Sequence, residues 1–205
     1  PHANTRPLGA LTDWLEASGQ RAFSAMLLDM YPRGSISEQP YVEGQDPFEI
    51  ASWFDPANYA IRKNRRFRNL WIRGGPRARV FFADRPHRAP TLNKLPLVRW
   101  RRGYAYVNST HSMLPARLNA CWDGPGDPRL SGALLHTKFL PEIVAKSAIE
   151  RTRRQHFHDP DAFDDYYAAL GANPDLWHPG AARLAGWQSL VAAGLMGTGD
   201  WCPPW

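Results

Sequence analysis

The sequence has 205 residues, of which 43% are hydrophobic and 21% are charged, and its formal net charge is +6 at pH 7. These values are typical of one ordinary globular domain. No apolar stretch reaches the roughly 18 residues of a membrane-spanning helix, and residues 1–8 lack the apolar segment of a secretory signal. Cys121 and Cys202 lie far apart, which excludes a disulfide-rich fold and predicts two free thiols in a reducing cytosol.

The first expected element is a helix over residues 7–18. Leu8, Leu11 and Leu15 share one of its faces, Pro7 suits its first turn, and Gly19 suits the position just after its end. The continuous apolar run over residues 23–28 predicts a strand that is buried on both faces. Residues 32–58, rich in proline, glycine and acidic residues, are expected to be mostly loop.

Three further strands are expected over residues 78–82, 96–100 and 104–110, with a hairpin turn at 101–103. A fourth is expected over 133–140, followed by helices over 141–155, 160–171 and 181–196. This order predicts an α/β or α+β domain with a mixed sheet, flanking helices and a helical C-terminal segment. We expect residues 1–140 to form the sheet region and residues 141–205 to pack on it as a helical segment, within one domain.

His136 and Lys138 stand out because they would share one face of the expected strand. A single histidine in a strand is most often a hydrogen-bonded core residue, but lysine is almost never buried without a partner. This face is therefore expected to meet a cavity, an anion or a carboxylate. A neutral imidazole is a good ligand for Mn²⁺ or Zn²⁺, and an ammonium group binds phosphate. His111 also follows an expected strand, where ligands bind in α/β sheets, although a loop histidine without a ligand is the alternative.

Other charged residues allow more than one interpretation. Asp29 ends the apolar strand, where it would be a metal ligand, a general base or a structural cap. Arg77 and Arg79 would share a face of a strand and clamp a phosphate, or form a solvated basic edge, and Lys94 is similar in kind. Residues 61–79 hold eight arginines and lysines and no acidic residue, which predicts contact with phosphate, with an anionic surface or simply with water.

The sequence contains no P-loop, no G-x-G-x-x-G and no G-x-S-x-G motif. Six segments, taken in order, nevertheless resemble bacterial family 2-like glycosyltransferases of the GT-A superfamily, which are distantly similar to glycosyltransferase family 92. The resemblance runs from about residue 1 to residue 197. Its segments are MLLDMYP (26–32), GGPRARVF (74–81), NKLPLV (93–98), STH (109–111), LLHTKF (134–139) and RQH (154–156).

The resemblance implies that the chain is the C-terminal, acceptor-side part of a GT-A-like fold. In that family a nucleotide-binding half with an Asp-x-Asp motif precedes this region, so we expect this part to be inactive alone. The implied reaction is metal-dependent transfer of a sugar from a nucleotide sugar to a glycan or envelope acceptor, in polysaccharide biosynthesis. The expected location is cytoplasmic, without a transmembrane segment or a DNA or RNA partner, and with peripheral membrane association as an option.

The resemblance also implies roles for individual residues. A late histidine at a strand end completes the coordination of Mn²⁺ or Mg²⁺ on the donor diphosphate, basic residues neutralise the leaving group, a carboxylate accepts the proton of the acceptor hydroxyl, and an aromatic platform holds the sugar. For the metal-binding histidine the candidates are His136 and, as its competitor, His111. The basic residues would be Lys138, Arg77, Arg79 and Lys94, and the carboxylate base would be Asp29 or Asp46. The aromatic platform would come from Tyr31, Trp53, Trp71 or Trp100.

Two other functions fit the same sequence. The first is a nucleic-acid or polyanion-binding module that uses residues 61–79 and depends on Arg65, Arg66 and Arg68. Its affinity would fall steeply with salt, be indifferent to Mn²⁺, and survive substitution of His136 by alanine. The second is a carbohydrate-binding remnant that binds glycans but no nucleotide sugar.

Overall fold

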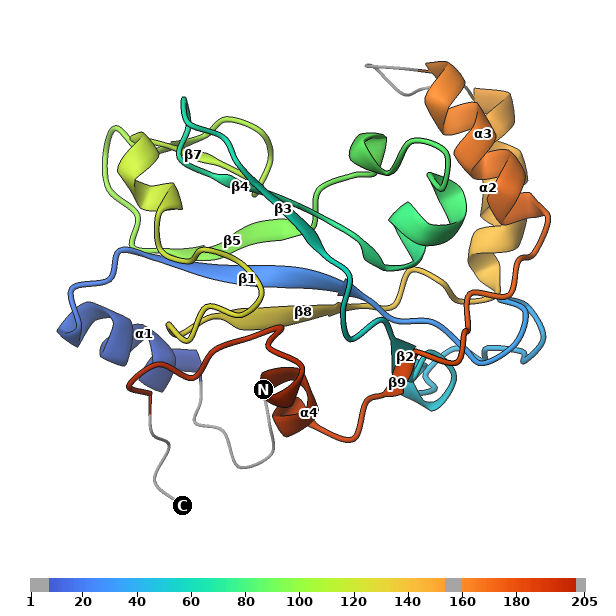
Figure 1. The fold of residues 1–205 in the computed structure, drawn as a ribbon, viewed down its shortest axis with the longest axis horizontal. Coiled ribbons are helices and arrows are strands. Elements are labelled where there is room, and N and C mark those ends of the chain that lie inside the picture. Colours follow the sequence, from blue (N-terminus) through green and yellow to red (C-terminus); the bar gives the residue numbers. More distant parts are fainter. Residues whose placement is uncertain (1–7, 154–159, 202–205) are drawn as a thin grey trace.

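A computed structural model describes residues 8–153 and 160–201 of the chain. These residues form a mixed α/β structure (Figure 1). Its elements are α1 (Leu8–Ala17), β1 (Ala22–Asp29), the short helix η1 (Pro47–Glu49), β2 (Trp53–Phe54), β3 (Ala60–Lys63), β4 (Leu70–Arg73), the π-helix η2 (Arg77–Phe81), η3 (Pro86–Arg88), β5 (Asn93–Val98), β6 (Ala105–Tyr106), β7 (Met113–Leu114), η4 (Ala116–Asn119), β8 (Gly132–His136), α2 (Glu142–Arg153), α3 (Pro160–Gly171), β9 (Ala182–Arg183) and α4 (Trp187–Ala192).

Strand β1 is the centre of a three-stranded mixed sheet with the order β5-β1-β8. Strand β5 runs antiparallel to β1, whereas β8 runs parallel to it and places His136 directly beside Asp29. Seven of the eight residues of β1 are buried, because its apolar run is covered on both faces. The predicted mixed sheet and the predicted doubly buried strand are therefore confirmed.

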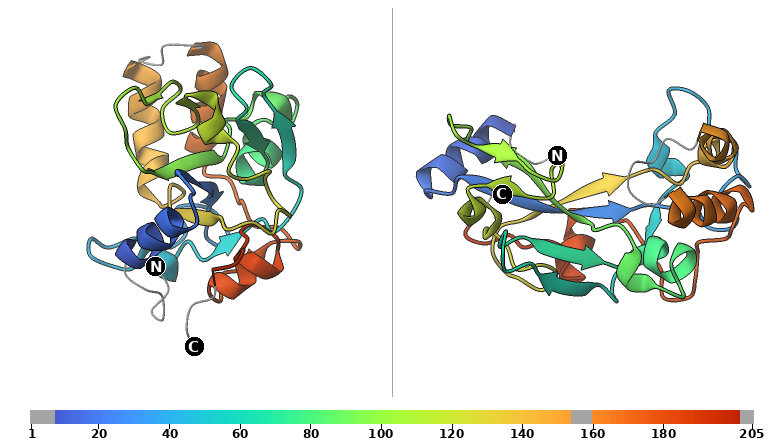
Figure 2. Two further views of the ribbon diagram at one scale, coloured as in Figure 1. Left: turned by 90° about the vertical axis from the view of Figure 1, so that its left-hand side faces the viewer. Right: turned by 90° about the horizontal axis from the view of Figure 1, so that it is seen from above.

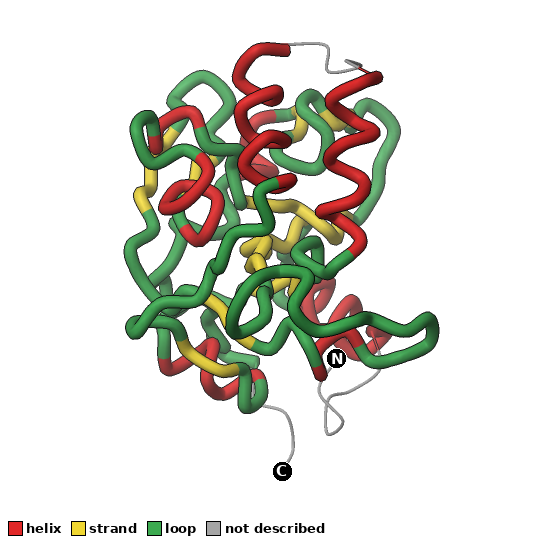
Figure 3. Tube along the Cα trace, turned by 90° about the vertical axis from the view of Figure 1, so that its right-hand side faces the viewer, coloured by secondary structure: helices red, strands yellow, loops and turns green. Residues whose placement is uncertain are grey.

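The helices lie mainly at the two ends of this sheet. Helix α1 lies where β1 begins, and the paired helices α2 and α3 lie at the end where β1 and β8 finish (Figures 1 and 2). Seen from that end, α2 and α3 stand side by side in front of the strands (Figure 3). The predictions of α1, α2 and α3 are confirmed, and no helix among the described residues is long and apolar enough to span a membrane.

The C-terminal segment is not a separate helical layer. Strand β9 pairs with β2, Asp175 forms a bridge with Ser35, and Leu190 of α4 packs in the main core beneath β1. The predicted helix over residues 181–196 is therefore wrong for most of its length. Residues 182–183 form strand β9 instead of a helical turn. Gly186 at φ 151° then has a backbone conformation that a helix does not allow, and the six-residue α4 begins only after it.

Three of the predicted strands are also wrong in extent or kind. Of the expected strand 104–110, only Ala105–Tyr106 forms as β6. Residues 77–81 form the π-helix η2, because Gly75 at φ 62° turns the chain and Phe81 then packs between Phe139 and Tyr166. Strand β8 ends at His136 because its partner β1 ends at Asp29, so Lys138 lies beyond the sheet.

The predicted hairpin around residues 101–103 does not form as a pair of neighbouring strands. A turn is present, since the Tyr104 N–H donates to the Arg101 carbonyl at 3.1 Å. The strands on either side of this turn do not pair with each other, however. Strand β5 pairs with β1, and the short β6 pairs with β7. Tyr104 and Met113 are drawn into a small core with Ala22 and Leu95, which decides this pairing.

The basic segment 61–79 holds a hairpin that the sequence did not reveal. Strands β3 and β4 pair in antiparallel register, and the Asn64 side chain accepts hydrogen bonds from the N–H groups of Arg66 and Phe67 in the connecting turn. All residues of β3 are exposed, so no alternation of apolar and polar side chains marks it as a strand.

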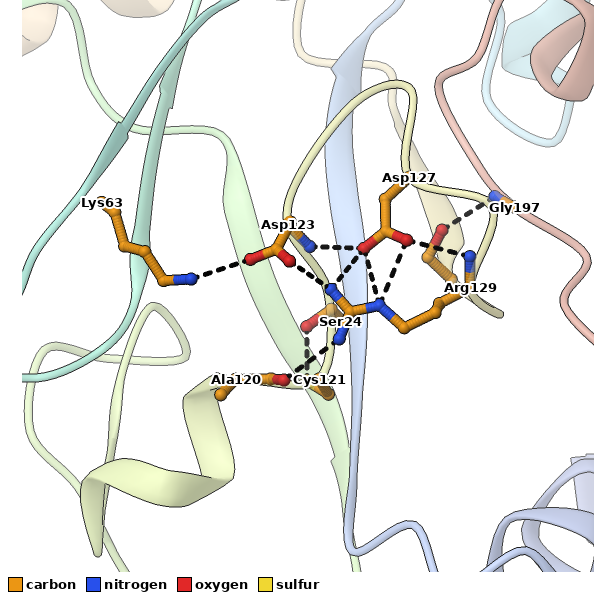
Figure 4. Close-up of polar contacts among 9 residues, drawn as sticks. Ser24, Lys63, Ala120, Cys121, Asp123, Asp127, Arg129 and Gly197 are labelled. Carbon is orange, nitrogen blue, oxygen red and sulfur yellow. Dashed lines mark hydrogen bonds and ion pairs between the residues drawn. The ribbon is translucent and has the colours of Figure 1, made fainter.

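A loop over residues 120–131 ties the sheet to the C-terminal segment. The Asp127 carboxylate accepts hydrogen bonds from the backbone N–H groups of Asp123 and Arg129 and from the Arg129 guanidinium, which also reaches Asp123 (Figure 4). Beside it, Gly197 donates its N–H to the Ser131 hydroxyl at 2.8 Å. Burial acts to raise the pKa of the Asp127 carboxyl, but these hydrogen bonds hold it below its ordinary value.

Replacing Gly197 by alanine is expected to lower the free energy of unfolding by about 1–3 kcal/mol. A Cβ atom there would lie 2.7 Å from the carbonyl oxygens of Asp127 and Pro128 and closer still to that of Arg129, and backbone atoms yield little. Urea unfolding followed by circular dichroism measures the change.

The matched control is Gly9→Ala in the exposed first turn of α1. A Cβ atom at Gly9 would meet nothing within 4 Å, so alanine should raise the stability by about 0.5–1 kcal/mol through helix propensity. Equal stability of the wild type and Gly197→Ala would contradict the close packing of residue 197 on the 120–131 loop.

Candidate functional site

The carboxyl ends of β1 and β8 bring together an acidic, a basic and an imidazole side chain. Asp29 Oδ1 accepts a hydrogen bond from Arg77 Nη2 at 2.7 Å and lies 2.9 Å from His136 Nδ1. The His136 Nδ1 atom is also 2.9 Å from Arg77 Nη2. A carboxylate is the stronger acceptor, so we assign the Nδ1 hydrogen of His136 to the bond with Asp29.

Asp29 and Arg77 form a buried ion pair. Their side chains are 1% and 9% exposed, respectively. Burial acts to raise the pKa of the Asp29 carboxyl, but the charge of Arg77 and the hydrogen bonds of His136 and Arg77 hold it below its ordinary value. Asp29 Oδ2 and Arg77 Nε have no hydrogen-bond partner among the described residues. Arg77 therefore holds Asp29 through one charge-assisted hydrogen bond, from Nη2 to Oδ1, and not through a bidentate pair.

His136 is oriented for contact with a ligand. Its Nδ1 atom faces Asp29, and no hydrogen bond from the described part of the chain reaches its Nε2 atom. The side chain is 34% exposed. An imidazole whose Nδ1–H is held by a carboxylate presents the Nε2 lone pair outward, as histidine ligands of metals do. Within residues 8–149 and 165–201, however, no three histidine, cysteine, aspartate or glutamate side chains are close enough to hold a metal ion, so His136 would be a single ligand.

Two lysines add positive charge around this pair. Burial and then the charge of Arg77 lower the pKa of Lys138 to about 8, and the same two causes lower the pKa of Lys94. Lys138 Nζ lies 4.8 Å from the centre of the Tyr166 ring on α3. Burial first and the charge of Arg77 second thus disfavour the protonated form of both lysines.

His111 belongs to the same neighbourhood but has both nitrogens engaged. Its Nδ1 hydrogen is donated to the Asn93 carbonyl at 2.6 Å, and its Nε2 atom accepts from Lys94 Nζ at 3.3 Å. Burial, followed by the charges of Lys94 and Arg77, lowers its pKa, so the ring is neutral at pH 7. As a metal ligand His111 would have to displace Lys94, whereas His136 would displace nothing. The name "Arg77 cluster" is used below for Asp29, Arg77, Lys94, His111, His136 and Lys138.

Arg79 and Tyr31 do not join the Arg77 cluster. Successive residues of the π-helix η2 diverge, so Arg79 turns to Asp55, whose Oδ2 it contacts through Nε at 3.1 Å. Tyr31 donates its hydroxyl to the same carboxylate, and His178 donates Nε2–H to it at 3.2 Å. The expectation that Arg77 and Arg79 share one face of a strand is wrong, because a helical turn replaces the strand.

A cleft of about 370 Å³ opens beside this second group. Asp55, Arg79 and His178 line it together with Gly74, where a Cβ atom would collide with the Tyr59 ring. Burial and then the charges of Asp55 and Asp29 raise the pKa of Tyr59, so this half-buried side chain is influenced by both carboxylates. The cleft and the Arg77 cluster are therefore neighbours.

Asp55 and His178 were missed from the sequence. No motif or spacing marks either residue, and only their meeting across 123 positions of sequence makes them a pair. The other candidate positions lie as follows. The Asp46 carboxylate caps η1 by accepting from the Phe48 N–H at 2.9 Å. The Tyr31 ring is fully buried, so it offers no open platform for a sugar.

Comparisons with known proteins add no relative. No protein-family profile, no curated protein and no solved structure matches the chain.

Proposed function

We propose that the Arg77 cluster binds the diphosphate of a nucleotide sugar, and that the chain acts as the acceptor-side part of a metal-dependent glycosyltransferase of the GT-A superfamily. The observation that carries the proposal is His136, held by Asp29 with its Nε2 atom outward, beside a buried arginine and the part-exposed Lys138. This combination lies at the carboxyl ends of β1 and β8, where ligands of α/β sheets commonly bind.

The charges of the cluster favour a multiply charged anion. Arg77, Lys94 and Lys138 are cationic at pH 7, Asp29 is the anion among the cluster's residues, and His111 is neutral. The excess positive charge matches a diphosphate better than a single carboxylate. Most of this charge is partly withdrawn from water, which strengthens its interaction with a bound anion.

Sugar transfer would use these groups in distinct ways. The acceptor oxygen bonds to the anomeric carbon, the bond from that carbon to the diphosphate oxygen breaks, and its electron pair leaves with the diphosphate. Lys138 would donate a hydrogen bond to the departing phosphate, and Arg77 would stabilise its charge from beneath. A divalent cation at His136 Nε2 would neutralise part of the diphosphate charge.

The acceptor would occupy the neighbouring cleft lined by Asp55, Arg79 and His178. This cleft offers carboxylate, guanidinium and imidazole groups for hydroxyl recognition, and its volume of about 370 Å³ suits one sugar. The base that accepts the hydroxyl proton stays a prediction. Asp29 is engaged with Arg77 and His136 and suits an orienting role, whereas Asp46 caps η1 and is not among the residues that line the cleft.

A second candidate function is polyanion binding by the β3–β4 hairpin. All four residues of β3 are exposed, and Arg65 and Arg66 in the adjoining turn are exposed as well. Such a surface would bind nucleic acid or another polyanion without Mn²⁺ and with a steep salt dependence.

Calorimetry with inorganic pyrophosphate, UDP and GDP, each with and without Mn²⁺, tests the leading proposal. We expect Mn²⁺-dependent binding of pyrophosphate, because the cluster needs only the diphosphate. His136→Ala should weaken it by about tenfold or more, as loss of a metal-site group commonly does. The matched control is His87→Ala, since His87 is an exposed histidine of η3.

The outcomes separate the two functions. Pyrophosphate binding that does not change with Mn²⁺ or in His136→Ala, but is lost in an Arg65→Gln/Arg66→Gln double variant, supports the polyanion module. Absence of pyrophosphate binding under every condition rejects the diphosphate site. Thermal unfolding of each variant, compared with the wild type, shows whether the change is confined to the site.

A further inference from the structure

An exposed aromatic and aliphatic surface lies where β5 ends and on the β6–β7 hairpin, whose connecting turn holds His111 of the Arg77 cluster. The side chains of Trp100, Tyr106, Val107 and Leu114 are 59%, 38%, 45% and 42% exposed. They are here called the Trp100 surface. Strand β5 ends near α1, whereas Lys138 of the Arg77 cluster lies against Tyr166 of α3, and Figures 1 and 2 show these helices at opposite ends of the molecule.

The apolar side chains face in more than one direction. The Trp100 ring lies 6.3 Å from the Tyr106 ring, centre to centre. Leu114 pairs with Ala105 across the β6–β7 ladder, so Leu114 and Val107 project from the face opposite to Tyr106. The face that carries Tyr106 also carries Met113, which is fully buried in the small core with Ala22 and Leu95. Val107 and Leu114 therefore lie on the open side of the hairpin, where they are available to one external surface.

Positive charge surrounds this surface. Arg101 and Arg102 are exposed and have no ion-pair partner in the part of the chain that the structure describes. Arg99 pairs with Glu16 at 2.6 Å, with both side chains about half exposed. The nearby guanidinium of Arg21, followed by the charges of Arg101 and Arg117, lowers the pKa of the Tyr104 phenol. Between Asp84 and Asp123 the sequence contains no acidic residue at all.

We infer that the Trp100 surface binds the headgroup region of an anionic phospholipid bilayer. Tryptophan and tyrosine prefer this region because one part of each ring is apolar and the other is polar. Arginines beside them pair with lipid phosphates, and the aliphatic Val107 and Leu114 reach the upper acyl chains. Nucleic acid would use the arginines and stack on the rings but would gain nothing from the two aliphatic side chains.

Flotation with phospholipid vesicles tests this inference. The full chain is mixed with vesicles of phosphatidylcholine alone, or with 30% phosphatidylglycerol, at low and at high NaCl. We expect binding to the anionic vesicles that weakens at high salt. Arg101→Gln/Arg102→Gln should reduce the affinity about 30-fold, since each arginine at an anionic surface contributes about fivefold. Trp100→Ala should reduce it about tenfold, and Trp100→Tyr should retain most of it.

The matched control is Arg65→Gln/Arg66→Gln, which removes two exposed charges from the turn of the β3–β4 hairpin, outside the Trp100 surface. Three results would overturn the inference: no binding to anionic vesicles, equal losses in both double variants, or binding that Trp100→Ala leaves unchanged. The last result together with tight binding to DNA or heparin would assign the arginines to a soluble polyanion. The melting temperature of each variant is measured as well. A value within a few degrees of the wild type shows that a loss of vesicle binding does not come from unfolding. Vesicle binding does not depend on the diphosphate site, so pyrophosphate binding can fail while this inference holds.

Discussion

Replacing Arg77 by methionine is expected to lower the free energy of unfolding by about 3–5 kcal/mol, because it leaves the Asp29 carboxylate buried without its counter-charge. The Asp29 side chain is 1% exposed, and Arg77 Nη2 lies 2.7 Å from its Oδ1 atom. His136 would remain as one partial donor. Urea unfolding at pH 7, with m-values compared between variants, measures the loss.

The control is Arg99→Met, the same substitution in an exposed ion pair. Arg99 and Glu16 are 49% and 58% exposed, so this change should be worth about 0–1 kcal/mol. The double variant Asp29→Asn/Arg77→Met removes both charges and should recover much of the stability. If Arg77→Met is no more harmful than Arg99→Met, the buried pair does not hold these elements together.

The difference in unfolding free energy between the wild type and Arg77→Met is expected to depend on pH in one direction. In the wild type the Asp29 pKa is lowered, so its stabilising effect is present above the ordinary value of 3.8 and is lost as the pH falls through the lower folded pKa. Without Arg77, burial alone raises that pKa, and protonation then relieves the penalty. The stability difference between wild type and Arg77→Met should therefore shrink as the pH falls below neutrality.

Replacing Lys138 by methionine is expected to weaken Mn²⁺-dependent pyrophosphate binding about 10- to 100-fold at pH 7, the range for one hydrogen bond to a charged group. Burial and the charge of Arg77 lower the Lys138 pKa to about 8. As the pH rises above this value the free protein loses the proton, and binding must first restore it. Wild-type affinity should then fall up to about tenfold per pH unit relative to the variant.

Isothermal titration between pH 6.5 and 9.5, expressed as the ratio of wild-type to variant affinity, cancels the ionisation of pyrophosphate itself. Lys63→Met is the control, because Lys63 lies in the exposed β3–β4 hairpin and should leave binding unchanged. A constant ratio across this pH range would mean that Lys138 does not contact the anion. Loss of binding in both lysine variants would point to the hairpin instead.

Local sequence patterns were enough to predict the elements that carry their own burial signal. The apolar run of β1 and the amphipathic helices α1, α2 and α3 appear where the sequence placed them. The spacing of apolar residues within each of these segments is enough to predict the element without knowledge of distant residues. His136 and Lys138 were also identified at once, since a lysine close to an apolar strand requires a partner.

The composition of the site was decided by the tertiary structure. Asp29 and His136 are 107 residues apart, and only the parallel register of β1 with β8 makes them neighbours. The π-helix η2 sends Arg77 to Asp29 and Arg79 to Asp55, although both arginines stand in one short motif. Neither outcome follows from local propensity, because packing of Phe81 against Phe139 and Tyr166 sets the helical turn.

The sequence by itself therefore determined the central strand, three helices and the presence of a cationic strand-end site. The tertiary structure decided which acidic residue orients His136, separated Arg79 and Tyr31 from that site, and created the Asp55–His178 pair. The physical reason is the range of the interactions. Burial patterns act between residues that are near in sequence, whereas ion pairs and strand register join residues that the chain brings together only after it folds.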